Sequence, residues 1–311
     1  MTTTEPHRHP LDGLLTVMWH YVRDPAQAPR VGSPGLDLAT FDAQLDRLDR
    51  ERAVVDWPSV AAALTGGPPL PAGAALLTFD DGLADHARSV APRLDARGWR
   101  GVFFAMAREP GEPLTVGHAL HVLLAPLGPD GLRDAVLDRL PAPDAARFEA
   151  LQERERRAGT EPLDILKRPL QRDLLGVVEP ILQELVEERV GPTGDVADSL
   201  HLAPADVATM RAAGHTIGGH GRRHLWFDHE PADRVAAEIA ASAAFLAPEP
   251  GPWAFAYPYG ASGGGSAGAL ERAGFAAAFH ASPRLPGDRF GLGRADAEDP
   301  AFGDLVRRSV P

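Results

Sequence analysis

The chain has 311 residues, of which 44% are hydrophobic and 24% are charged, a composition typical of a soluble globular protein. Its formal net charge of −12 argues against nucleic acid or an anionic membrane as the main partner, because a basic surface supplies most of that affinity. The chain has no cysteine, which excludes disulfides, thiol nucleophiles and Cys-ligated zinc and leaves His, Asp and Glu as metal ligands.

The N-terminal residues 1–13 are polar and contain proline, which predicts a flexible tail before a single domain over residues 14–311. No basic segment leads into an apolar run there, so we expect no secretory signal. No run approaches 18 apolar residues, so we expect no membrane span. We therefore expect a cytoplasmic protein, which meets small metabolites more readily than finished polymers.

Apolar runs alternate with helical patterns in the first third of the chain. The sequence predicts buried strands at 14–22, 74–79 and 101–107, and helices at 41–52 and 85–98. Short connections between strand, helix and strand are typical of parallel β/α architecture. We expect the α/β class and a distorted (β/α) barrel with fewer than eight regular units.

Residues from about 113 to 197 interrupt this rhythm, because their pattern is almost entirely helical. We interpret them as a helical insertion between β/α units. One hypothesis is that the insertion caps the active-site end of the barrel; the alternative is an outer packing layer that never touches substrate.

The β/α alternation resumes after the insertion. Helices are expected at 204–213 and 232–246 and strands at 253–260 and 274–282, with a further strand possible at 290–296. Glycine and proline cluster at the joints between these elements, where turns are needed.

Two consecutive carboxylates, Asp80 and Asp81, follow the strand 74–79 and precede Gly82. The C-terminal ends of parallel strands are where ligands bind in β/α folds. One carboxylate can bind a metal there while the other acts as a base toward water. A turn with helix-capping carboxylates is the alternative explanation of Asp-Asp-Gly.

His220 and His224 lie four residues apart. On a helix or a tight helical turn this spacing would put both imidazoles on one face, where they can chelate one ion. Two histidines and one aspartate form a ligand set that leaves positions open for water and substrate. The alternative is a pair of surface histidines.

An aromatic strand, 253–257, runs into the turn Pro258-Tyr259-Gly260. A backbone N–H held at such a turn can donate to an oxyanion. An aromatic core strand stopped by a turn explains the same residues.

Three motifs in this order, TFDDG (78–82), AAGHTIGGH followed by His224, and FAYPYG (255–260), resemble the polysaccharide deacetylases of the NodB-homology type, carbohydrate esterase family 4. The resemblance covers roughly residues 14–110 and 200–296. It implies a NodB-type barrel and the hydrolysis of an N-acetyl or other N-acyl group of an amino sugar or glycoconjugate precursor.

The resemblance also implies roles for residues. Asp80 would be the general base, and Asp81, His220 and His224 would hold a divalent metal, usually Zn²⁺ although Co²⁺, Ni²⁺ or Mn²⁺ can serve. The turn at Tyr259 would offer its backbone N–H to the oxyanion.

The chain departs from the family pattern at three places. Gly221 replaces a Ser or Thr whose hydroxyl would brace the loop, and Ala256 replaces an Arg that would orient the base. Arg294 is a candidate substitute for that Arg. The segment that supplies the general acid is not recognisable, and we expect His280, which ends a strand, to take that role.

His20 also ends a strand on the presumed active-site side, where it would line the substrate pocket. A core histidine is the alternative for His20, and a structural one for His280.

Two other functions stay open. A deformylase or small-amide hydrolase would use the same site, and a catalytically lapsed carbohydrate-binding protein would keep the fold without the reaction. The expected partner is an N-acylated amino sugar or related small molecule, and the oligomeric state is undetermined.

Overall fold

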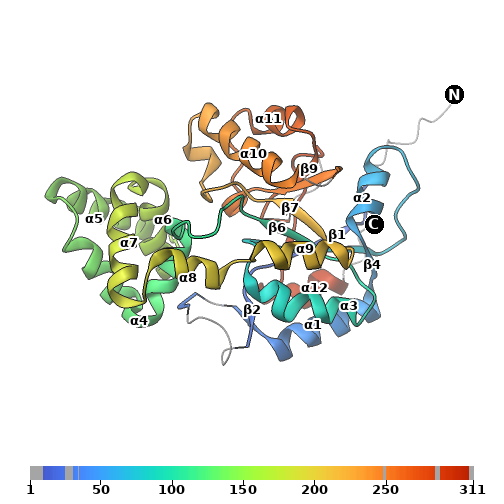
Figure 1. Cartoon of the computed structure of the whole chain (residues 1–311), viewed down its shortest axis with the longest axis horizontal. Helices are drawn as coiled ribbons and strands as arrows, with labels where there is room; N and C mark the ends of the chain where they lie inside the picture. The colour runs from blue at the N-terminus through green and yellow to red at the C-terminus, as the bar shows by residue number, and fades with distance from the viewer. Residues whose placement is uncertain (1–9, 25–30, 34, 248–249, 284–287, 308–311) are drawn as a thin grey trace.

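A computed structural model describes residues 10–24, 31–33, 35–247, 250–283 and 288–307. Within these residues the chain forms a curled parallel sheet covered by helices, with a second group of helices at one side (Figure 1). Most of the expected N-terminal tail, residues 1–9, lies outside the described part.

Eight parallel strands form the main sheet of the described chain, in the order β10-β1-β5-β6-β7-β8-β9 with β4 paired to β5. Their continuous apolar sequences suit strands that are buried on both faces. They are β1 (Leu15–Trp19), β4 (Ala53–Val55), β5 (Ala74–Phe79), β6 (Val102–Ala105), β7 (Thr216–Gly219), β8 (Trp253–Ala256), β9 (Phe275–Phe279) and β10 (Ala295–Asp296). Two short strands, β2 (Val22–Arg23) and β3 (Leu36–Asp37), pair separately.

One segment closes the curled sheet into a barrel. Leu292 exchanges backbone hydrogen bonds with the end of β9, and Ala295 pairs with Val17 of β1. The strand expected at 290–296 is therefore only two residues long in the sheet, because its first half serves β9 and its second half serves β1. The fold class expected from the sequence, a distorted (β/α) barrel, is confirmed.

Helices cover the outside of the barrel and one of its ends. The expected helix at 85–98 begins with a π-helical turn, η1 (His86–Val90), and continues as α3 (Ala91–Asp95). The others are α1 (Leu38–Glu51), α2 (Trp57–Leu64), α9 (Pro204–Ala212), α10 (Ala232–Leu246), α11 (Ser266–Arg272) and α12 (Phe302–Arg307), with short 3-10 turns η2 (Phe227–His229) and η3 (Pro258–Gly260).

Alternate residues of the strands fill the barrel interior. Leu76, Val102, Phe104 and Phe279 pack there, and Trp57 of α2 lies against them. The intervening residues face the outer helices and form a separate core. Because side chains alternate along a strand, Thr78 and Asp80 continue the interior row of Leu76 toward the carboxyl end. That end is where the site lies.

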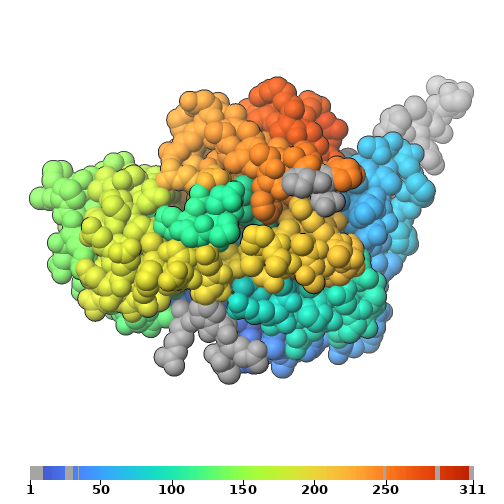
Figure 2. Space-filling view, in the orientation of Figure 1, coloured from blue at the N-terminus to red at the C-terminus, as the bar shows by residue number. Residues whose placement is uncertain are grey.

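The second group of helices comes between β6 and α9: α4 (Val116–Leu137), α5 (Ala142–Arg157), α6 (Pro162–Arg172), α7 (Leu175–Arg189) and α8 (Thr193–Leu200). We call these five helices the insertion. They share an apolar core that includes Leu123, Phe148 and Leu182. The segment that leads to them from β6 lies at the surface between the insertion and α10 (Figure 2). No helix of the described residues is long and apolar enough to span a membrane.

Candidate metal centre

Three residues of the described chain have a left-handed backbone without being glycine: Asp81 (φ 71°), His224 (φ 53°) and Tyr259 (φ 57°). Such a conformation costs on the order of 1–3 kcal/mol per residue and persists only where the surroundings impose it. All three are candidate site residues from the sequence, and they come from three separate loops. Backbone strain is therefore concentrated at one place in the molecule.

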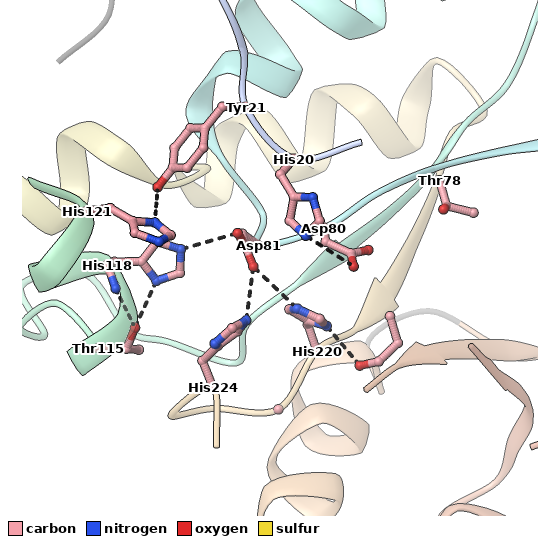
Figure 3. A network of polar contacts seen from close by, with 12 residues as sticks. His20, Tyr21, Thr78, Asp80, Asp81, Thr115, His118, His121, His220 and His224 are labelled. Atoms are coloured by element: carbon pink, nitrogen blue, oxygen red, sulfur yellow. Dashed lines mark hydrogen bonds and ion pairs between the residues drawn. The ribbon is translucent and has the colours of Figure 1, made fainter. Parts of the chain in front are cut away.

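Asp81, His220 and His224 meet at the carboxyl end of the sheet (Figure 3). One carboxylate oxygen of Asp81, Oδ1, lies 3.3 Å from Nε2 of His220 and 3.1 Å from Nε2 of His224. Among the described residues, this is the group whose ligand atoms all lie within 4.8 Å of one another as a metal site requires. Two imidazole nitrogens and one carboxylate oxygen suit zinc and similar divalent cations.

The two histidines reach this position from a loop and not from a helix. Residues 220–224 have no helical structure, so the expected helical turn is wrong. The chain instead reverses through Gly221 (φ 73°) and His224. Four-residue spacing brings the rings together here because the loop folds back on itself.

The two histidines differ in how readily their Nε2 atoms would be free to bind a cation. Nδ1 of His220 lies 2.8 Å from the carbonyl of Ala256, which can only accept, so Nδ1 carries the proton and Nε2 stays free toward Asp81. Burial lowers the pKa of His224 to about 4, although the neighbouring Asp81 carboxylate acts to raise it, so the ring is neutral near pH 7. Burial alone would lower the pKa of His220 too, but Asp81 and Asp80 raise it, so a cation would compete with a proton there.

Helix α10 braces the histidine loop. The carboxylate of Glu238 accepts the backbone N–H groups of Arg222 and Arg223 at 2.7 and 2.8 Å, and the hydroxyl of Ser242 accepts that of Gly221 at 3.0 Å. These two buried side chains replace the loop hydroxyl that Gly221 lacks. A Cβ at Gly221 would lie 2.8 Å from Glu238 Oε2, so the brace itself requires glycine.

Asp80 lies beside the metal site in a bidentate ion pair with Arg294. Nη1 and Nη2 of Arg294 each donate to one oxygen of Asp80 at 2.6 Å, and both side chains are buried. Burial alone would raise the pKa of Asp80, but the guanidinium of Arg294 holds it below its usual value. The sequence suggested Arg294 as an orienting residue, and the segment that closes the barrel brings it there.

His20 lies at the solvent-exposed side of the site. Its Nε2 is 3.9 Å from Asp80 Oδ2, and its side chain is 34% exposed, whereas Asp80, Asp81 and His220 are 5% exposed or less. His20 is therefore the most solvent-exposed of these four side chains.

The turn after β8 packs its aromatic ring against the histidines. The ring of Tyr259 stacks on Trp226 at 4.3 Å and meets His224 edge-on at 4.4 Å. Burial raises the pKa of Tyr259, so its hydroxyl keeps its proton.

His280 lies one step further from the metal ligands. Its Nδ1–H donates to the carbonyl of Gly260 at 2.8 Å, and its own carbonyl accepts from Nε of Arg294. The ring therefore contacts the turn Pro258–Gly260, and the backbone carbonyl of His280 accepts from Arg294, which in turn pairs with Asp80.

The sequence analysis missed His118, which comes from the first turn of α4 in the insertion. Its Nε2 lies 3.5 Å from the second oxygen of Asp81, Oδ2, and its side chain is 2% exposed. His121 and His201 also pack beside it, with ring centroids 5.9 and 4.7 Å away. The only signal in the sequence is a pair of histidines in an apolar helix, and nothing there indicates which helix faces Asp81.

A cavity of about 630 Å³ reaches Asp81 from the side of α9 and is lined mainly by apolar side chains such as Met106, Val207 and Phe245. Asp80, His220 and Tyr259 are not among the residues that line it. Of these four site residues, the cavity therefore adjoins only Asp81.

Three solved structures share the fold over nearly the whole chain. Deacetylase PplD of Streptococcus pyogenes, solved with acetate, is 13% identical with a TM-score of 0.59, and the alignment covers 96% of this chain and 98% of that one. IcaB from Ammonifex degensii is 18% identical with a TM-score of 0.58 and the same coverage. A de-N-acetylase from Aggregatibacter actinomycetemcomitans is 15% identical with a TM-score of 0.57, covering 94% and 99%. At these identities the likeness shows the fold alone.

Sequence comparison finds a similarity to one family over part of the chain. No curated protein matches the chain. Residues 178–278 match the model of the polysaccharide deacetylase family, a segment that contains His220, His224 and Tyr259 and begins after Asp80 and Asp81. Over the histidine segment the chain is therefore similar to the polysaccharide deacetylase family, and over nearly its whole length it shares the fold of solved deacetylases.

Proposed function

We propose that the chain is a divalent-metal-dependent hydrolase that removes an N-acetyl or other N-acyl group from an amino sugar or related small molecule. The observation that carries the proposal is the buried pair of adjacent carboxylates, one facing two imidazole nitrogens and the other held ionised by Arg294. The family match and the deacetylase fold support a carbohydrate amide as the substrate.

Asp81, His220 and His224 would hold the cation, which we propose to be Zn²⁺ or another divalent ion such as Co²⁺, Ni²⁺ or Mn²⁺. Asp81 suits this role because its Oδ1 is buried and makes no hydrogen bond within the protein. When bound, such a cation supplies Lewis acidity to the acyl carbonyl and to water.

The remaining residues would move protons and stabilise charge. Asp80 accepts the proton of the attacking water, and its bidentate contact with Arg294 keeps it ionised and fixed in orientation. The backbone N–H at Tyr259 donates to the oxyanion that forms at the carbonyl. When it carries protons on both nitrogens, His280 would donate the one on Nε2 to the departing amine nitrogen while its Nδ1–H stays on the carbonyl of Gly260. His20 would line the entrance.

Metal analysis and acetate release test the proposal together. We expect the purified chain to bind about one Zn²⁺ or Co²⁺ and to release acetate from an N-acetylated amino sugar. D81N should lose both, whereas D80N and H280Q should keep the metal and lose at least about 100-fold in kcat, the usual range for acid–base groups. Formate release from a formamide substrate instead would favour the deformylase alternative. Bound metal without release from any N-acyl substrate would favour the carbohydrate-binding alternative.

A further inference from the structure

The insertion touches the metal centre directly. Gly117, in the first turn of α4, lies so close to Tyr259 that a Cβ there would be 2.7 Å from the tyrosine hydroxyl. Arg172 of α6 lies over the ring of Trp226, which stacks on Tyr259. On the same side, Arg223 of the histidine loop pairs with Glu179 of α7 at 2.6 Å.

His118 is the residue of the insertion that faces a metal ligand. Asp81 turns Oδ1 to His220 and His224 and leaves Oδ2 for His118 (Figure 3). His118 is outside the group of three whose ligand atoms lie within 4.8 Å of one another. It is therefore placed to act on Asp81 and not to bind the cation itself.

Thr115, the N-cap residue of α4, determines which nitrogen of His118 carries the proton. Its hydroxyl lies 2.8 Å from Nδ1 of His118, while the oxygen also accepts the backbone N–H of His118. With Nδ1 accepting from Thr115, Nε2 carries the proton and points at Asp81 Oδ2. The opposite tautomer would set the Nε2 lone pair against a carboxylate oxygen at 3.5 Å, where the two repel.

We propose that Thr115 and His118 form a positioning relay, in which His118 holds the carboxylate of Asp81 in its metal-binding orientation. This inference rests on the proposed function, because it assigns the relay to that same metal site. The present separation of 3.5 Å is longer than a formed N–H···O bond, and a shift of about 0.5 Å closes it. Partners of this kind orient metal ligands, and their loss costs about 10–100-fold in metal affinity.

The test measures metal affinity and not turnover. We expect H118L to bind Zn²⁺ about 10–100-fold more weakly than the wild type in competition with a chromophoric chelator. H118Q should recover part of the loss, because its amide N–H can donate to Asp81. T115V should weaken binding in the wild type and have no further effect in H118L, because Thr115 acts only through His118.

H121L is the matched control. His121 is a buried histidine of the same helix whose Nδ1 contacts the hydroxyl of Tyr21 and not Asp81. Its loss should disturb the packing of α4 comparably while the affinity for Zn²⁺ stays within about threefold of the wild type, well inside the outer-shell effect. Equal losses in H118L and H121L, or no loss in H118L and H118Q, would overturn the relay.

The two proposals fail in different ways. A wild-type chain that takes up no Zn²⁺, or a D81N variant that binds it as tightly, overturns the metal-dependent function together with the relay. Binding that requires Asp81 but not His118 overturns the relay alone.

Discussion

Arg294 and Asp80 form the best-defined side-chain contact of the site. Arg294 is 1% exposed, donates to both oxygens of Asp80, and lies over the ring of Phe104. A bidentate guanidinium fixes the orientation of a carboxylate as well as its charge. At the scale of single residues, this pair therefore decides whether Asp80 stays ionised.

Removal of Arg294 should be costly. We expect R294M to lower the free energy of unfolding by about 3–5 kcal/mol in urea, because it leaves the Asp80 carboxylate buried without a partner. The double variant D80N/R294M should recover much of that loss. R93M is the control, since Arg93 pairs with Asp42 where both side chains are 30% exposed or more, and should cost at most about 1 kcal/mol. A cost for R294M as small as for R93M would contradict this account.

At the scale of elements, the histidine loop depends on α10. Glu238 is only 5% exposed, and its Oε2 accepts hydrogen bonds from two backbone N–H groups of the loop. The loop carries no hydroxyl of its own, so its conformation is imposed from a helix that comes later in the chain. A loop braced in this way can keep His224 in a strained backbone.

Restoration of the family's hydroxyl should therefore destabilise this protein. We expect G221S to lower the free energy of unfolding by about 1–3 kcal/mol, because the residue has φ 73° and its Cβ would displace Glu238. It should also weaken Zn²⁺ binding. G264S is the control, since a Cβ at Gly264 meets nothing within 4 Å and should leave both quantities unchanged. A G221S variant as stable as the wild type would show that Glu238 is not what the loop depends on.

At the scale of the whole molecule, buried histidines couple stability to pH. Burial lowers the pKa of five histidines below the ordinary value: His86, His121, His201, His215 and His224. The pKa of His220 is raised instead. A histidine with a folded-state pKa below about 6.5 binds fewer protons folded than unfolded, so stability is lost as pH falls below about 6.5.

Urea unfolding with a chelator present should show this dependence. Between pH 7.5 and 5.5 we expect the free energy of unfolding to fall by roughly 1 kcal/mol for each fully buried histidine that stays neutral. H86Q should reduce the difference between the two pH values, because His86 is one of these residues and lies outside the metal site. Equal or higher stability at pH 5.5 would mean that these histidines are protonated in the folded protein.

The sequence by itself determined the barrel and most of its strands. It also identified the four residues that meet at the carboxyl end of the sheet, namely Asp80, Asp81, His220 and His224. Continuous apolar runs that end in Asp80-Asp81 or in glycine are local patterns, and parallel strands bring their carboxyl ends to one edge. Arg294 could be named as a substitute for the missing arginine because the strand that precedes it was recognisable. It could not be placed, because its segment divides its hydrogen bonds between β9 and β1.

Only the tertiary structure decided what surrounds those residues. His118, Glu238 and Ser242 act across distances that no periodicity or spacing encodes, since each reaches the site from a helix whose sequence shows only its own amphipathic pattern. The same limit applies to the spacing of His220 and His224, which suggests a helix but occurs in a loop. Local sequence determines where a strand ends, whereas the packing of distant elements determines which side chains meet there.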